Sequence, residues 1–239
     1  MADKKFFLLW FFYINSVIGL ILLSYWMGIF QLGFQYDKSY LSFVILGWWV
    51  VAESVIGLNV WNQTREFKCL NGFKKQLAIG NNLNSVLAMP QFNNSLVANY
   101  AAYMLRRYEN SKQSFDQTQM AAALERKLMN RNSFGWLASN LIVFLGLLGT
   151  VIGIVLTFWP FINTSVAIDI ARIQTHLSSI FAGVGAAFFP SIYSAIFCVF
   201  ILISDRISNN STHALLNELM AVLETDVIAH VEYTNADTQ

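Results

Sequence analysis

Residues 145–153 read LGLLGTVIG and lie inside an apolar run from about 136 to 161. Three glycines so close together are costly in a helix that faces water, because each glycine is about 1 kcal/mol less favourable than alanine. In a membrane helix the same glycines let a neighbouring backbone approach closely, and Gly149 and Gly153 have GxxxG spacing. The run is therefore predicted to be a membrane helix that can pack tightly against another helix.

One face of this predicted helix carries only small or hydroxyl side chains. Gly146, Thr150, Gly153 and Thr157 share that face, whereas Leu, Ile, Val and Phe occupy the others. The simpler interpretation is tight helix packing, with each threonine hydroxyl bonded to its own backbone. The alternative is that the hydroxyls line a polar path through the membrane. Spacing alone favours packing.

The next apolar run, from His176 or Leu177 to Ile203, also has a face of small and hydroxyl side chains. We call each of these two faces a smooth stripe. Pro190 removes one backbone donor, so it should bend this helix or free a carbonyl next to Ser191. Two such stripes could line a narrow shared cavity, or they could pack on each other. The members of the second stripe are Gly183, Ala187, Ser191 and Ala195, with Gly185 and Ser194 beside them.

Two further apolar runs come earlier in the chain, from about Phe6 to Phe30 and from Leu41 to Val60. Each of the four runs reaches the roughly 20 helical residues that cross about 30 Å of hydrocarbon. Composition agrees, because 56% of the 239 residues are hydrophobic and only 12% are charged. The first run is too long for a secretory signal and lacks a small-residue cleavage site, so we expect it to be retained.

Basic residues indicate how the spans are oriented. All but two of the 15 Lys and Arg residues lie at the N-terminus, between 62 and 135, or after the fourth span; the exceptions are Lys38 and Arg172. Because loops rich in Lys and Arg stay in the cytoplasm, both termini and the long loop are predicted to be cytoplasmic.

The cytoplasmic part is predicted to be helical. Pro90 interrupts the long loop, and Ser114 with Gln117 has the spacing of a capping box. Apolar residues then recur at helical spacing in the loop and again in the tail. The loop positions are Ala121, Leu124 and Leu128, and the tail positions are Leu216, Leu219, Leu223 and Val227.

These patterns predict an all-α membrane protein with four transmembrane helices. A cytoplasmic helical bundle is expected from the loop between the second and third helices and from extensions of the third and fourth. The predicted regions are 1–61 for the first two helices, 62–135 for the cytoplasmic loop, 136–203 for the last two helices and 204–239 for a cytoplasmic C-terminal helix.

Charged side chains are missing from both smooth stripes. A protein that moves ions through hydrocarbon normally supplies an ionisable relay or a ring of charge. If this chain helps to conduct ions, the proton-carrying group must therefore come from a partner. The one acid inside a predicted span is Glu53. It is a possible transport carboxylate, although interfacial hydration or a neighbouring hydroxyl would also explain it.

Other classes of function find no support in the residues. The three histidines (His176, His213 and His230) and the two cysteines (Cys69 and Cys198) have no metal-ligand spacing. No nucleophile–base arrangement or phosphate-binding loop is present, so neither an enzyme nor a metal site is predicted. A net charge of +1 provides no basic footprint for nucleic acid.

At its two stripes the chain resembles the MotA/TolQ/ExbB proton-channel family. Residues 145–153 are close to the family signature LLGLLGTVxG, and the run that contains Glu125-Arg126-Lys127 resembles the helix that leads into it. Residues 182–191 read AGVGAAFFPS and resemble the family pattern G-x-G-x-A-[FL]-x-T-T. The resemblance covers roughly 121–205, and its first motif is the more specific.

The resemblance implies a channel-forming subunit of an ion-driven motor in the bacterial inner (cytoplasmic) membrane. In such motors a homopentamer surrounds a dimer of single-span chains of the MotB, TolR or ExbD kind, each with an ion-binding aspartate. Thr150 and Ser191 match the family's threonines that face the ion path, whereas Pro190 departs from the pattern. Four spans with a cytoplasmic N-terminus resemble the flagellar stator type. The ion (H+ or Na+) and the load, which could be gliding, envelope transport or phage defence, stay open, and no cofactor is expected.

The stripes and the resemblance together define the candidate site. The predicted ion-path residues are Thr150, Thr157, Pro190, Ser191 and Ser194, and the residues predicted to pack helices beside the path are Gly146, Gly149, Gly153, Gly183 and Ala187. Two alternatives stay open. One is a self-sufficient channel or transporter that uses Glu53, and the other is a structural scaffold whose stripes only pack helices.

Overall fold

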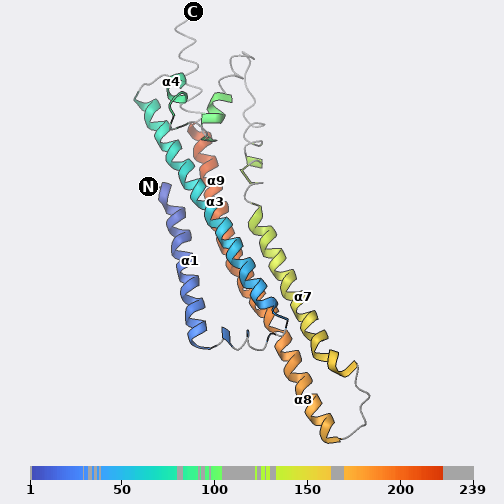
Figure 1. Ribbon diagram of the computed structural model, residues 1–239. Coiled ribbons are helices and arrows are strands. Elements are labelled where there is room, and N and C mark those ends of the chain that lie inside the picture. Colours follow the sequence, from blue (N-terminus) through green and yellow to red (C-terminus); the bar gives the residue numbers. More distant parts are fainter. Residues whose placement is uncertain are drawn as a thin grey trace, which may run out of the picture. The chain divides into compact units, whose positions relative to one another are not determined.

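The computed structural model describes residues 2–28, 30–31, 34, 37, 39–79, 83–90, 92, 95–96, 98–103, 122, 125–126, 128–129, 133–162 and 170–222. Within these residues the regular structure is helical and contains no strand, which confirms the predicted all-α class. The helices are α1 (Ala2–Trp26), α3 (Leu41–Ala78), α4 (Leu83–Leu87), α7 (Phe134–Ile162), α8 (Ile170–Ala187) and α9 (Phe189–Val222) (Figure 1).

Four stretches of the described helices are long and apolar enough to cross a membrane, as the sequence predicts. The third of them, α7, matches its predicted limits to within two residues. The first, α1, ends at Trp26 rather than near Phe30. The chain leaves the helix at Gly28, whose φ of 79° lies in the left-handed region that favours glycine.

The second span continues well beyond its predicted end. α3 runs without interruption to Ala78, although its apolar run ends near Val60. Past that point large apolar side chains recur every three or four residues and so form one face of an amphipathic helix. These side chains are Phe67, Leu70, Phe73 and Leu77. The predicted loop from residue 62 therefore starts as a continuation of the membrane helix.

The fourth span consists of two helices. α8 ends at Ala187, Phe188 forms a turn, and α9 begins at Phe189. At this break the Phe188 N–H donates to the Gly185 carbonyl at 3.3 Å, across three residues instead of four. Pro190 has no N–H with which to continue the α8 hydrogen-bond ladder. The bend predicted at this proline thus takes the form of a break, and α9 then supplies the predicted extension of the fourth helix.

A hydrogen-bonded cap precedes α3. Asp37 Oδ1 accepts hydrogen bonds from the backbone N–H of Ser39 at 2.9 Å and from its hydroxyl at 2.6 Å, and Oδ2 accepts one from the Ser42 N–H at 2.9 Å. The first N–H groups of a helix have no partner within the helix. The Asp37 carboxylate supplies one, in the manner of an N-cap residue.

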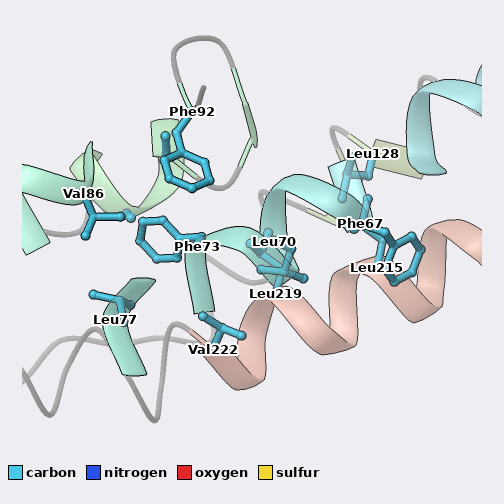
Figure 2. Packing of buried hydrophobic residues seen from close by; sticks show 12 residues of the cluster. Phe67, Leu70, Phe73, Leu77, Val86, Phe92, Leu128, Leu215, Leu219 and Val222 are labelled. Atoms are coloured by element: carbon cyan, nitrogen blue, oxygen red, sulfur yellow. The ribbon is translucent and has the colours of Figure 1, made fainter. Parts of the chain in front are cut away.

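The chain forms two compact units. The first comprises Met1–Trp10, Gly57–Asn132 and Ile207–Gln239, and the second comprises Phe11–Ile56 and Ser133–Arg206. Large side chains from α3 and α9 meet in the first unit, in an apolar cluster that Figure 2 shows. Its buried members are Phe67, Leu70, Phe73, Leu77, Val86, Phe92, Ala98, Ala101, Leu128, Leu215, Leu219 and Val222.

Several predicted cytoplasmic features lie outside the described residues. They are the capping box at Ser114 and Gln117, the loop positions Ala121 and Leu124, the tail positions Leu223 and Val227, and most of the extension predicted before the third span. Leu128 and Leu219, from the same two patterns, belong to the apolar cluster. The predicted regional limits and the cytoplasmic placement of these segments stay predictions.

Candidate functional site

The two smooth stripes face each other inside the second unit. α7 and α8 lie side by side (Figure 1), and α9 continues the contact after the break. In order along α7, the facing pairs are Gly146 with Ser194, Gly149 with Pro190, Gly153 with Ala187, and Thr157 with Gly183. Residue numbers rise along α7 as those of the partners fall, so the packed helices are antiparallel.

The four stripe glycines have no room for a side chain. A Cβ at Gly153 would lie 2.7 Å from the Ala187 Cβ, and one at Gly149 would lie 2.5 Å from the Pro190 Cβ. Non-bonded carbon atoms prefer about 3.5–4.0 Å, so these glycines set the distance between the helices. Gly185 lies outside the contact, and a Cβ there would meet no atom within 4 Å.

Thr150 and Ser191 form a hydroxyl pair at the half-buried edge of this contact. Both hydroxyls also lie within hydrogen-bond distance of the Gly146 carbonyl, Ser191 Oγ at 2.9 Å and Thr150 Oγ1 at 3.1 Å. Each hydroxyl has a single hydrogen. One of them therefore donates to the carbonyl while the other donates to its neighbour, and unused lone pairs remain on both oxygens.

The other two predicted path hydroxyls are buried. Thr157 is 6% exposed and donates to the Gly153 carbonyl at 2.8 Å; Ser194 is 3% exposed and donates to the Ser191 carbonyl at 2.9 Å. Both bonds stay within one helix, which is how a hydroxyl satisfies itself in a membrane segment. Of the five predicted path residues, Thr150 and Ser191 are the two that reach the surface of the chain. The path-lining role of all five stays a prediction.

Glu53 lies in a separate polar contact of the second unit. Its side chain is 4% exposed, and its Oε2 accepts a hydrogen bond from the Ser204 hydroxyl at 2.6 Å. Ser204 and Ser191 are both on α9, and a rise of 1.5 Å per residue puts them about 20 Å apart along the helix axis. The Tyr13 phenol of α1 lies beside this pair and donates to the Phe200 carbonyl at 2.9 Å. The structure thus brings a hydroxyl to Glu53 but does not bring Glu53 to the stripes.

Ser204 and Tyr13 are not among the predicted site residues. A signal for Ser204 exists, because Ser204, Ser208 and Thr212 recur every four residues on α9 and all three are buried. Small hydroxyl residues at that spacing are typical of helix–helix contacts in membranes. Tyr13 has no comparable signal, since an isolated tyrosine in an apolar run is equally typical of a residue at the membrane interface.

The described residues contain no group of three or more His, Cys, Asp or Glu side chains that could hold a metal ion. His213 is exposed, whereas His230 and the side chain of His176 lie outside the described part. Cys69 and Cys198 are free thiols, each half-buried.

Residues 93–220 match the family model described as the MotA/TolQ/ExbB proton channel family. This segment is more than half of the 239-residue chain. It contains α7, α8 and nearly all of α9, and therefore both stripes, but neither α1 nor α3. A search among curated proteins found no match.

Proposed function

This chain belongs to the MotA/TolQ/ExbB proton channel family, and we propose that it is the channel-forming subunit of an ion-driven membrane motor. In this proposal a homopentamer of the chain surrounds a dimer of single-span partners of the MotB, TolR or ExbD kind. Each partner carries an aspartate in its span. H+ or Na+ reaches that aspartate along the edge of the α7–α9 contact, and its binding and release turn one ring against the other.

The observation that carries the proposal is the chemistry of the stripes. Thr150 and Ser191 present oxygen lone pairs at the edge of the contact, and residues 134–162 and 177–203 contain no Asp, Glu, Lys, Arg or His. Hydroxyl oxygens can accept a hydrogen bond from a protonated acid, or replace part of the hydration shell of Na+. They cannot carry the charge themselves, which is why the proposal needs a partner with a carboxylate.

The close approach of the helices supports the same proposal. The contact beside the hydroxyl pair is made by Gly146, Gly149 and Pro190, and both hydroxyl residues are only half-buried. A partner helix can then approach the pair closely, provided that the edge with Thr150 and Ser191 faces the centre of the ring.

The proposed placement is the bacterial cytoplasmic membrane, with both termini and the loop between α3 and α7 in the cytoplasm. It is supported by four stretches able to span a membrane and by the position of all but two of the 15 Lys and Arg residues on one side of those spans. Labelling of single cysteines introduced near Lys38 and into the loop, with a reagent that does not cross membranes, tests this orientation in intact cells.

Native mass spectrometry of the detergent-purified complex tests the proposal itself. The chain should be expressed with its chromosomal neighbours, so that a single-span partner can assemble with it. The expected result is a pentamer that holds two copies of a single-span chain with an aspartate in its span. A monomer, a dimer, or a ring that no partner enters would overturn the proposal.

A structural scaffold is the second candidate, and one observation favours it. All four stripe hydroxyls bond within the chain itself, and Thr157 and Ser194 do so entirely inside the helix contact. If packing were the only role of the stripes, replacing the Thr150 hydroxyl would leave ion-driven activity unchanged. The motor proposal requires that activity to fall.

A further inference from the structure

Glu53 is the one acid inside the predicted spans, and the motor proposal does not use it. Its side chain is 4% exposed in the second unit. Oε2 accepts a hydrogen bond from the Ser204 hydroxyl, with 2.6 Å between the two oxygens, whereas Oε1 is buried and has no hydrogen-bond partner in the described part of the chain. If the Glu53 carboxyl group were ionised here, the negative charge on Oε1 would be buried without a hydrogen-bond donor.

Among the described residues, no positively charged side chain acts on Glu53. From α1, Tyr13 is the titratable neighbour, and its phenol hydrogen is already donated to the Phe200 carbonyl. On α9, Asp205 follows Ser204, but its side chain lies against Gly135 of α7, and Arg206 is exposed. A buried carboxylate without a counter-charge is much less favourable than the neutral acid.

One further donor lies close by. Trp49 is one turn before Glu53 on α3, and its buried indole Nε1 lies near the Glu53 carboxyl group but has no hydrogen bond of normal geometry with any described residue. A small shift would let that N–H donate to the carboxyl group. Such a bond would be neutral, so it would satisfy an oxygen lone pair without balancing a negative charge.

We propose that Glu53 is a proton-binding site of this chain, in which Oε1 carries the proton and Oε2 is held by Ser204. The ligand is a single proton, and the site lies between α1, α3 and α9, apart from the hydroxyl pair of Thr150 and Ser191. It therefore adds a protonation site to the chain that is independent of the partner's aspartate. Loss of that proton would place an unpaired charge between α3 and α9 and draw water into their contact.

Infrared spectroscopy of the full-length chain, purified in a maltoside detergent that has no ester carbonyl, tests this site at neutral pH. A neutral carboxylic acid has a carbonyl-stretch band that a carboxylate lacks, and the band shifts in heavy water. The expected result is that wild type shows this band and Glu53→Gln loses it. Glu218→Gln, which changes a half-exposed acid of α9 in the other unit, should keep it.

A second variant keeps the test decisive if Glu53→Gln does not fold. Ser204→Ala removes the donor to Oε2, so the acid band should persist and move to higher frequency. Spectra in which Glu53→Gln loses carboxylate bands, or in which Ser204→Ala leaves the acid band where it was, would overturn the proposal. Neither measurement requires the partner chain or ion-driven activity, so its outcome is separate from that of the motor proposal.

Discussion

The stripe contact of the second unit and the apolar cluster of the first join helices by opposite means. Along the stripes, glycines bring backbones together and leave no space even for a Cβ. In the apolar cluster, Phe67, Phe73 and Leu219 fill the space between helices and are at most 2% exposed. The predicted placement of the stripes in the membrane and of the apolar cluster in the cytoplasm would account for this difference, because lipid is as apolar as leucine and large side chains gain little by meeting there. In water, burying each one contributes about 1.5–3 kcal/mol.

One helix, α9, takes part in both contacts, since it carries Pro190 and Ser194 of the stripe contact and Leu219 of the apolar cluster. On α3 the division between the units falls after Ile56, and on α9 it falls after Arg206. Both positions are close to the span ends expected from hydropathy, Val60 and Ile203. On α9 the change from small to large packing residues gives a second physical reason, besides hydropathy, to expect a membrane boundary near Ile203.

Truncating a side chain of the apolar cluster should have the largest effect on stability. Phe73 is fully buried and packs edge-on against Phe92, with ring centroids 5.7 Å apart. Phe73→Ala should lower the free energy of unfolding by about 3–5 kcal/mol, because it removes a buried ring and leaves a cavity. Thermal and denaturant unfolding of the detergent-purified chain would measure the change.

Ile79→Ala is the matched control. Ile79 lies just beyond the end of α3 and is 65% exposed, so its truncation should change the free energy of unfolding by no more than about 0.5 kcal/mol. If both variants lowered the free energy of unfolding equally, the apolar cluster would not be a packed core. The proposed difference between the cluster and the stripe contact would then be wrong.

Adding one carbon to the stripe contact should have the next largest effect. Gly146→Ala would force a Cβ into the Ser194 side chain, whereas Gly185→Ala places the same atom in open space. Overpacking of this kind costs about 1–3 kcal/mol, while alanine in an unobstructed helix position gains up to about 1 kcal/mol over glycine. The two variants should therefore shift the melting temperature in opposite directions. A shift of the same sign and size would mean that glycine matters here only through helix propensity.

Much of this contrast could be predicted from the sequence. The GxxxG spacing and the four-residue steps of the second stripe predict close helix packing because both depend on local periodicity. The apolar residues that recur at helical spacing likewise predict an amphipathic helix around Leu128 in the loop and another around Leu219 in the tail. What periodicity could not decide was which residues meet. The pairing of Gly149 with Pro190 depends on the register between two helices, and the extension of α3 depends on the partners that Phe67 and Leu70 find in α9.

The candidate site was only partly predictable for a related reason. Thr150, Thr157, Ser191 and Ser194 are similar in the sequence, since each is a hydroxyl in a smooth stripe. The structure separates them, because Thr150 and Ser191 pair at the half-buried edge of the contact, whereas Ser194 lies against Gly146 and Thr157 against Gly183 inside it. Such a difference follows from the local helix geometry, which residue types alone do not specify.

Removing a hydroxyl from the stripes tests that separation. Thr150→Val keeps the shape of the side chain but removes its oxygen, and Thr150→Ser restores the oxygen. If the pair accepts a hydrogen bond from a protonated carboxyl or contacts Na+, the loss is about 1.4 kcal/mol or more, which corresponds to roughly a tenfold fall in ion-driven turnover. Ion-driven activity of the assembled complex in cells or proteoliposomes would be the measurement.

Thr157→Val is the control for this series, because its hydroxyl is buried and donates to its own helix. Thr157→Val should keep ion-driven turnover within about twofold of wild type, because it removes only a neutral hydrogen bond within one helix. A fall of the same size in both threonine variants would extend the ion path along the whole stripe. No fall in either would favour the scaffold.

The smallest effect is expected where α3 begins, at a contact made by neither glycines nor large apolar side chains. Burial raises the pKa of Asp37, but the hydrogen bonds from Ser39 and Ser42 outweigh burial and hold this pKa below its ordinary value of 3.8. Because the folded pKa is the lower one, the ionised cap adds stability that is complete above about pH 4 and is lost as the pH falls through the folded value. Asp37→Ala should therefore cost about 1 kcal/mol at neutral pH. Unfolding measured at a series of pH values should show this difference shrinking below pH 4; a difference that stayed constant would mean that the side chain caps α3 without its charge.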